Sequence, residues 1–174
     1  SVKGIVILTD QKNMPDTSLK NVLCYEELLE AESDKFEWPD MDENTASTLC
    51  YTSGTTGNPK GVLYSHRSTI LHTWIASSGN GMNVSSSSVI LPVVPMFHVN
   101  AWGIPYAAAM FGAKLVLPGP ALDGASLYEL IDAEKPQLLM GVPTVWLGLL
   151  QFLREGNHTL DSVELALVGG SAAP

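Results

Sequence analysis

Residues 51–61 combine glycines, hydroxyl side chains and one lysine directly after a short apolar run. Glycine lets the backbone approach an anion closely, and backbone N–H groups and hydroxyls can then donate hydrogen bonds to its oxygens. Lys60 adds a positive charge on a flexible side chain. The stretch therefore predicts a phosphate-binding loop, with the sequence Tyr51-Thr52-Ser53-Gly54-Thr55-Thr56-Gly57-Asn58-Pro59-Lys60-Gly61.

This loop differs from a Walker A motif, which has Gly, four residues and then Gly-Lys-Ser/Thr. Here Pro59 precedes Lys60 and Gly61 follows it. The structural alternative is a polar surface loop between two strands. The string from Tyr51 to Val62 resembles the signature loop of the adenylate-forming (acyl-activating) superfamily, which includes acyl-CoA synthetases, firefly-type luciferases and peptide-synthetase adenylation domains. The resemblance implies that Lys60 is catalytic, that Thr55 is a metal ligand, and that the nucleotide phosphates are bound by Thr52, Ser53, Gly54, Thr55, Thr56, Gly57 and Lys60.

A second informative string is Val94-Pro95-Met96-Phe97-His98-Val99-Asn100-Ala101-Trp102. A single histidine beside apolar residues is more often structural than catalytic, and a lone tryptophan is usually core. The string is similar, however, to medium- and long-chain fatty acyl-CoA synthetases, in which a Phe-His pair lies at the acyl site and a following tryptophan gates the acyl tunnel. The resemblance implies a catalytic role for His98 and substrate contacts from Phe97, His98, Asn100 and Trp102.

Two further segments lie directly after predicted strands. Val142 lies in Gly141-Val142-Pro143-Thr144-Val145-Trp146, a strand–helix joint that the resemblance places at the wall of the acyl pocket. Gly169-Gly170-Ser171-Ala172 is a turn by itself, and the resemblance places it beside the adenine and the acyl carboxylate. The small residues Gly103, Ala107 and Ala108 serve either close helix packing or acyl-chain volume. We expect His66, Arg67 and His72 to be capping or surface groups, and His158 to lie in a polar loop without a role.

Composition limits the possible functions. The chain has 174 residues, a net charge of −9 and no basic stripe, which argues against nucleic-acid binding. The two cysteines lack metal-ligand spacing and are expected to be buried and reduced, which favours a cytoplasmic setting. Prolines, His98 and Lys114 interrupt the apolar region 89–118, so it is not a membrane span. Both ends adjoin buried-looking strands, so residues 1–174 are expected to be an internal fragment of a longer protein. The resemblance implies that this fragment belongs to an AMP-binding N-terminal domain, without its C-terminal domain.

Strand-like and helix-like segments alternate, which predicts an α/β fold with a mostly parallel sheet flanked by helices. Ligands of such sheets gather at the carboxyl ends of the strands. The phosphate loop, His98 and Gly169–Ser171 each follow a predicted strand, so they are expected to meet at one edge. The strands are expected at 5–8, 47–51, 62–65, 89–93, 114–117, 137–140 and 164–168, and the helices at 25–31, 67–77, 100–111, 126–133 and 144–153.

The resemblance implies a two-step reaction in which a carboxylate attacks the α-phosphate of ATP and coenzyme A then displaces AMP. ATP, Mg²⁺, coenzyme A and a fatty acid are the implied ligands, and peripheral membrane contact and a homodimer are further expectations. Short or sulfur-containing carboxylates, transfer to a carrier protein or an oxidase, and a non-catalytic relative remain alternatives. Because the family's other motifs are absent, residues 1–174 alone are expected to fold poorly and to be inactive.

Overall fold

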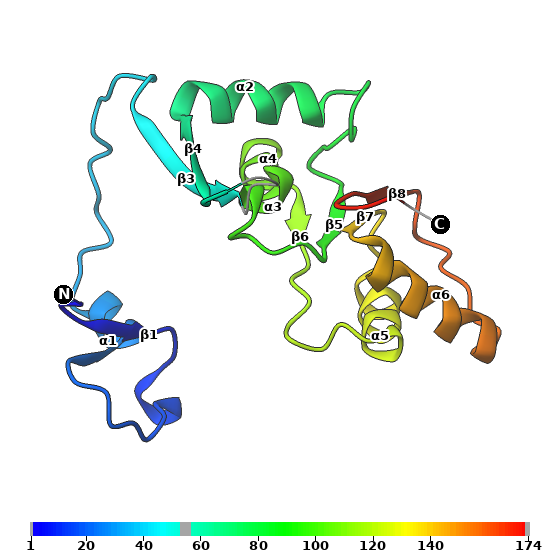
Figure 1. Ribbon diagram of the computed structural model, residues 1–174, viewed down its shortest axis with the longest axis horizontal. Helices are drawn as coiled ribbons and strands as arrows, with labels where there is room; N and C mark the ends of the chain where they lie inside the picture. Colours follow the sequence, from blue (N-terminus) through cyan, green and yellow to red (C-terminus); the bar gives the residue numbers. More distant parts are fainter. Residues whose placement is uncertain (1, 53–56, 173–174) are drawn as a thin grey trace. The chain divides into compact units, whose positions relative to one another are not determined.

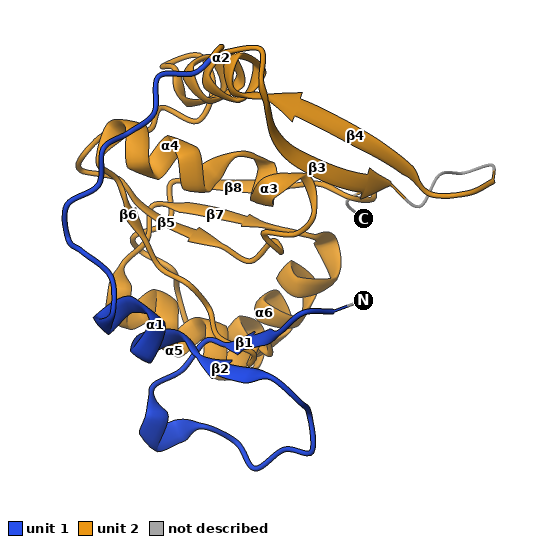
Figure 2. Cartoon of the chain, turned by 90° about the vertical axis from the view of Figure 1, so that its left-hand side faces the viewer, with its two compact units in different colours: residues 1–41 blue, residues 42–174 orange. Residues whose placement is uncertain are grey.

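The computed structural model describes residues 2–52 and 57–172, and the chain divides into two compact units, residues 1–41 and 42–174 (Figure 2). In the first unit, β1 (Ile5–Ile7) pairs in parallel with β2 (Val22–Cys24), a strand that the sequence reasoning missed. This unit also holds a 3₁₀ turn, η1 (Gln11–Asn13), and α1 (Tyr25–Glu30). None of the predicted site residues lies in it.

The second unit is built around a four-stranded sheet in the order β6-β5-β7-β8, with every pairing parallel (Figure 1). Its strands are β5 (Val89–Pro92), β6 (Lys114–Leu115), β7 (Leu138–Gly141) and β8 (Leu165–Val168). Every residue of β7 is buried, as expected of a strand covered on both faces. The predicted parallel α/β architecture is confirmed.

Helices cover both faces of this sheet, with α4 (Ile104–Phe111) on one face and α5 (Gly124–Glu134) and α6 (Pro143–Gly156) on the other (Figure 2). Alternate strand residues point to opposite faces. Ile90, Leu138 and Met140 therefore pack with Ile104 on the α4 side. Leu91 and Leu139 pack with α5 and α6 on the other side. The core thus fixes the positions at which β5, β7 and β8 end.

The strands that flank the predicted phosphate loop do not belong to this sheet. β3 (Ala46–Thr52) and β4 (Lys60–Ser65) form a separate antiparallel hairpin, so the expectation that this loop follows a parallel strand was wrong. The physical reason is the length of the connection, since parallel strands need a crossover of about a dozen residues or more. The predicted loop is therefore carried by a two-stranded ribbon.

Three helix starts show how local sequence sets these elements. Ser65 caps α2 (His66–Ser77) in a reciprocal capping box with Ser68, a strong start signal. The carboxylate of Asp123 caps α5 by accepting from the backbone N–H of Ser126. Pro143 opens α6 in its first turn, where proline is favoured, and the N-cap is Val142.

The helix expected over residues 100–111 is interrupted. Residues Val99, Asn100, Ala101 and Trp102 have φ values of 49°, 50°, 48° and 56°, and Gly103 follows with a φ of 79°. The short element α3 (Val99–Trp102) is therefore a left-handed turn, and the right-handed helix α4 begins only after it. Left-handed backbone costs an L-residue with a side chain roughly 1–2 kcal/mol, so this turn is strained.

His158 is not a free loop residue. Its ring lies 4.4 Å from that of Tyr128 and stacks on Phe152 with centroids 5.2 Å apart, so it helps to join α5 to α6. Cys24 and Cys50 are both buried and unpaired, as predicted. Across residues 2–52 and 57–172, no helix is both long and apolar enough to cross a membrane.

Candidate functional site

The hairpin places Thr52 and Lys60 directly opposite each other at its distal end. Opposed residues of an antiparallel pair project to the same face, and so do residues two apart on one strand. The side chains of Thr48, Cys50, Thr52 and Lys60 therefore share one face. Thr52, Gly57 and Lys60 are solvent-exposed, as a ligand-binding loop requires.

This shared face of the hairpin contacts the left-handed turn and α4. The buried Cys50 thiol donates to Oδ1 of Asn100 over 3.5 Å. Nearer the hairpin's base, the hydroxyls of Thr48 and Tyr106 share a hydrogen bond of 3.2 Å. The predicted phosphate loop and the predicted substrate-binding string are thus joined through β3.

The left-handed turn in turn contacts the end of β8. A Cβ placed on Gly169 would lie 2.9 Å from Cζ2 of Trp102, so the indole ring covers this glycine. A Cβ on Gly170 would lie 3.3 Å from Cγ1 of Val142, which follows β7. Asn100, Trp102, Val142, Gly169 and Gly170 are therefore brought together at the carboxyl ends of the parallel strands.

Phe97 and His98 precede the turn in the segment after β5. Phe97 is 86% exposed, and His98 is also exposed. The backbone of His98 is held on both sides, because its N–H donates to the carbonyl of Pro95 and its carbonyl accepts from the N–H of Ala101. The histidine backbone is fixed while both aromatic side chains face open space.

The remaining predicted residues lie beyond β8 or between β3 and β4 in the sequence. Ser171 and Ala172 are exposed residues beyond β8. The predicted phosphate contacts Ser53, Gly54, Thr55 and Thr56, with Thr55 the predicted metal ligand, lie outside the described residues.

Electrostatics leave Lys60 available to an anion. The ion pairs found among the described residues are Arg67–Glu43, Lys114–Glu134 and Lys135–Asp132, and none of them involves Lys60. Within the same residues, no cluster of three or more His, Cys, Asp or Glu side chains could hold a metal ion.

A mainly apolar cavity of about 270 Å³ lies behind the left-handed turn, between α2, β4 and α4. Asn100 and Gly103 form part of its wall, and His72 from α2 packs against Gly103, where an added Cβ would lie 2.9 Å from its Nδ1. His72 is exposed, as expected of a surface group, and it also lines this cavity. The cavity is lined by Tyr64, Ser68, Thr69, His72, Val99, Asn100, Gly103 and Tyr106.

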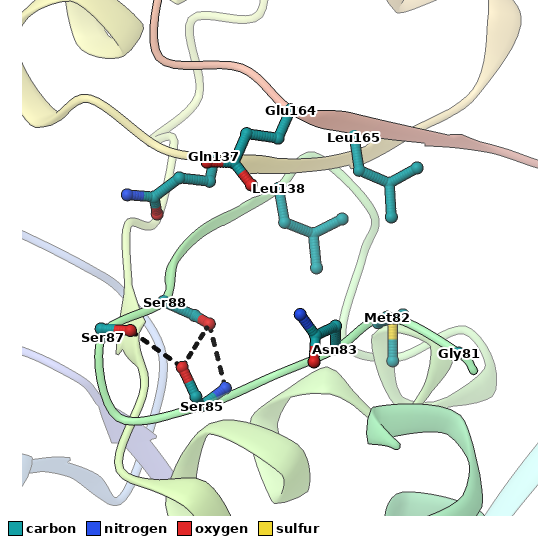
Figure 3. Close-up of a pocket in the computed structure, with 10 residues that line it drawn as sticks. All are labelled: Gly81, Met82, Asn83, Ser85, Ser87, Ser88, Gln137, Leu138, Glu164 and Leu165. Carbon is teal, nitrogen blue, oxygen red and sulfur yellow. Dashed lines mark hydrogen bonds between the residues drawn. The ribbon is translucent and has the colours of Figure 1, made fainter. Parts of the chain in front are cut away.

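A more polar cavity of about 340 Å³ lies at the opposite edge of the sheet, beside the amino ends of β7 and β8 (Figure 3). Its walls include the three serines 85, 87 and 88, which hydrogen-bond to one another, and the carboxylate of Glu164 (Figure 3). It contains no lysine or arginine and none of the predicted site residues. We therefore place the candidate site at the carboxyl edge.

Comparison with known proteins shows the family to which this chain belongs. The chain matches the AMP-binding enzyme family over residues 3–174 and belongs to it. It is 54% identical over 173 residues to a medium-chain-fatty-acid–CoA ligase of Ectopseudomonas oleovorans, covering 99% of this chain and 32% of that protein. It is 50% identical over 173 residues to a 3-methylmercaptopropionyl-CoA ligase of Ruegeria lacuscaerulensis, with the same coverage.

A long-chain-fatty-acid–CoA ligase of Thermus thermophilus is 52% identical over 161 residues, which is 92% of this chain and 29% of that protein. Among solved structures, the O-succinylbenzoate coenzyme A synthetase of Bacillus subtilis in complex with AMP superposes with a TM-score of 0.72 and 25% identity. That match covers 88% of this chain and 31% of the synthetase. The chain thus spans about a third of the length of these relatives.

Sequence reasoning missed three residues that hold the site together. Cys50 lies two positions before Thr52 on the same strand, so the alternation of β-strand side chains was a usable signal for it. His72 and Tyr106 gave no comparable signal, because their contacts with Gly103 and Thr48 join residues far apart in the sequence.

Proposed function

We propose that this chain forms the nucleotide- and acyl-binding part of an AMP-forming acid–CoA ligase. The observation that carries the proposal is the continuous path of contacts from Cys50 to Asn100, along the turn to Trp102, and from Trp102 to Gly169. This path brings a candidate phosphate loop and a candidate acyl site to one edge of the sheet, where α/β proteins bind ligands. Membership of the AMP-binding enzyme family supports the same assignment.

In the proposed first step, a substrate carboxylate attacks the α-phosphorus of ATP, and pyrophosphate leaves. Lys60 neutralises negative charge on the phosphates, and the hydroxyls and backbone N–H groups of residues 52–57 donate to their oxygens. Donors fixed in advance stabilise charge that develops in the transition state. In the second step the thiol of coenzyme A displaces AMP, giving the thioester. His98, which is exposed and directly precedes the turn, is the candidate residue for contact with the acyl carboxylate.

Mg²⁺ is part of this proposal because magnesium usually binds through substrate phosphates with one or two protein ligands. When bound, it would neutralise phosphate charge, with Thr55 as its candidate ligand. Among the described residues, no cluster of three or more His, Cys, Asp or Glu side chains could hold the ion by itself.

For the acyl group, we propose a medium- or long-chain fatty acid whose tail occupies the cavity behind the turn. The cavity surface is mainly apolar, and the relatives named for medium- and long-chain fatty acids support this class. A short, sulfur-containing acid is the second candidate. It is favoured by the relative named 3-methylmercaptopropionyl-CoA ligase and by a volume at the lower end of small-molecule sites.

Carboxylate-dependent exchange of pyrophosphate into ATP tests the proposal in the natural full-length protein. We expect exchange to peak with medium- or long-chain acids and AMP release to require coenzyme A. A peak at three- or four-carbon acids or their thioethers would favour the second substrate class. Exchange without coenzyme A-dependent AMP release would indicate transfer to another acceptor, and no exchange with any acid would contradict the proposed function.

We also propose a cytoplasmic enzyme that forms a homodimer and contacts membranes peripherally. The free, buried thiols of Cys24 and Cys50 support a reducing compartment. Sedimentation of the full-length protein, with and without anionic lipid vesicles, would measure both association properties.

A further inference from the structure

Trp102 lies against a glycine that has no conformational need to be glycine. Gly169 is absent from the residues with positive φ, whereas Gly170 beside it has a φ of 89°. What excludes a side chain at position 169 is the indole ring, because an added Cβ would lie 2.9 Å from Cζ2 and 3.0 Å from Cη2 of Trp102. Carbon atoms do not approach this closely, so an added methyl group at position 169 would require the ring to move.

The left-handed turn Val99–Trp102 holds the ring of Trp102 in this position. Its four residues have left-handed φ values, a strained arrangement that persists only where the surroundings enforce it. One enforcing contact is the Cys50–Asn100 hydrogen bond, and Gly103 directly after the turn accepts left-handed backbone without a side-chain cost. Trp102 itself packs against the core cluster on the α4 side of the sheet. The ring is therefore directed at Gly169 by a built arrangement.

We propose that Gly169 is a positioning residue that seats the Trp102 ring, and that the seated ring covers the start of the Gly169–Ser171 segment. A ligand that binds against this segment must displace the ring from its seat. The contact between Trp102 and Gly169 therefore couples ligand binding over the Gly169–Ser171 segment to the position of the turn, which forms part of the cavity wall. The role of Gly169 as the seat of the ring is argued from this contact, and only its effect on acyl selection rests on the proposed function.

The first test measures the position of the ring directly, without any activity. The full-length protein is labelled with 5-fluorotryptophan, and the ¹⁹F resonance of Trp102 is assigned by its loss in Trp102→Phe. We expect Gly169→Ala to shift this resonance and to leave the other tryptophan resonances in place. Gly148→Ala is the matched control, because a Cβ at Gly148 meets no atom within 4 Å. An unshifted Trp102 resonance in Gly169→Ala would overturn the proposal.

The second test is a double-mutant cycle that uses pyrophosphate exchange. Phenylalanine lacks the benzo-ring carbons that meet Gly169, so Trp102→Phe should make room for the added methyl group. We expect Gly169→Ala to change the ratio of kcat/KM for octanoate and butanoate about 10-fold, the effect of a methylene-sized misfit. In the Trp102→Phe background the same change should alter this ratio less than about 2-fold.

A ratio that shifts equally in both backgrounds would show that Gly169 acts without Trp102 and would overturn the proposal. If Gly169→Ala fails to fold, Trp102→Phe should restore folding, and failure to restore it would also count against the seat. If the wild-type protein supports no exchange, the proposed function fails while the ¹⁹F measurement still decides the seat.

Discussion

Gly103 and Gly148 should respond in opposite directions to the same added methyl group. Gly103 has a φ of 79°, and left-handed backbone costs alanine about 1–2 kcal/mol. The new Cβ would also lie 2.9 Å from Nδ1 of His72. That ring is the end of a flexible, exposed side chain and can move aside, so we assign most of the cost to the backbone.

Gly148 lies in the middle of α6, where an added Cβ meets nothing within 4 Å. Alanine is better than glycine inside a helix by about 1 kcal/mol. Gly103→Ala and Gly148→Ala should therefore differ by about 2–3 kcal/mol in the free energy of unfolding. In the natural full-length protein, this difference should appear as a higher Tm for Gly148→Ala than for Gly103→Ala.

Urea and thermal unfolding of the two variants, followed by far-UV circular dichroism, measures this gap. A His72→Ala background separates the two costs at position 103. Most of the loss caused by Gly103→Ala should remain there, because removal of the ring does not change the backbone. Equal stability of Gly103→Ala and Gly148→Ala would refute the left-handed conformation at position 103. If His72→Ala abolished the whole loss caused by Gly103→Ala, the backbone could not account for most of that loss.

Three further predictions concern Lys60, Ser65 and Asp123. Lys60→Ala should lower kcat/KM for pyrophosphate exchange about 10- to 100-fold, the loss of a charged hydrogen bond, whereas Lys12→Ala should not change it. Ser65→Ala should destabilise the protein by about 1 kcal/mol in urea unfolding, because the capping box of α2 is lost. Hydrogen bonds from the backbone N–H and the hydroxyl of Ser126 hold the pKa of Asp123 below its ordinary value. A carboxyl group with a lowered native pKa stabilises the protein above its unfolded pKa, and this stabilisation is lost as the pH falls through the native pKa. The free energy of unfolding of Asp123→Asn, measured from pH 6 to pH 2, should therefore lack this pH-dependent contribution.

The parallel sheet could be predicted because its strands are short apolar runs between polar or helical segments. Residues 137–140 and 164–168 were expected as strands, and β7 and β8 occupy nearly these positions. The pairing of β3 with β4 was missed although the sequence held the signal, since the connection from Thr52 to Lys60 is too short for a parallel crossover. Connection length should have outweighed the alternating pattern.

The left-handed turn could not be predicted in the same way. Ala101 and Trp102 favour ordinary right-handed geometry, and Val99 is β-branched, which makes its positive φ an outlier. Asn100 and Gly103, which tolerate left-handed backbone, are the local signals for a change of hand. The Cys50 contact that holds the turn comes from a distant part of the chain, so local propensity does not reveal it. Tertiary packing decided the geometry of the candidate site.

This turn has a consequence for how the chain tolerates substitution. In most helices glycine ranks near the bottom, whereas at a left-handed position it and asparagine rank at the top. A scan of all substitutions for folded yield should therefore show an inverted preference at Val99, which is 39% exposed and has a φ of 49°. Glycine enriched for yield but depleted for activity would mark the place where this chain gives up folding stability to hold a tryptophan in position.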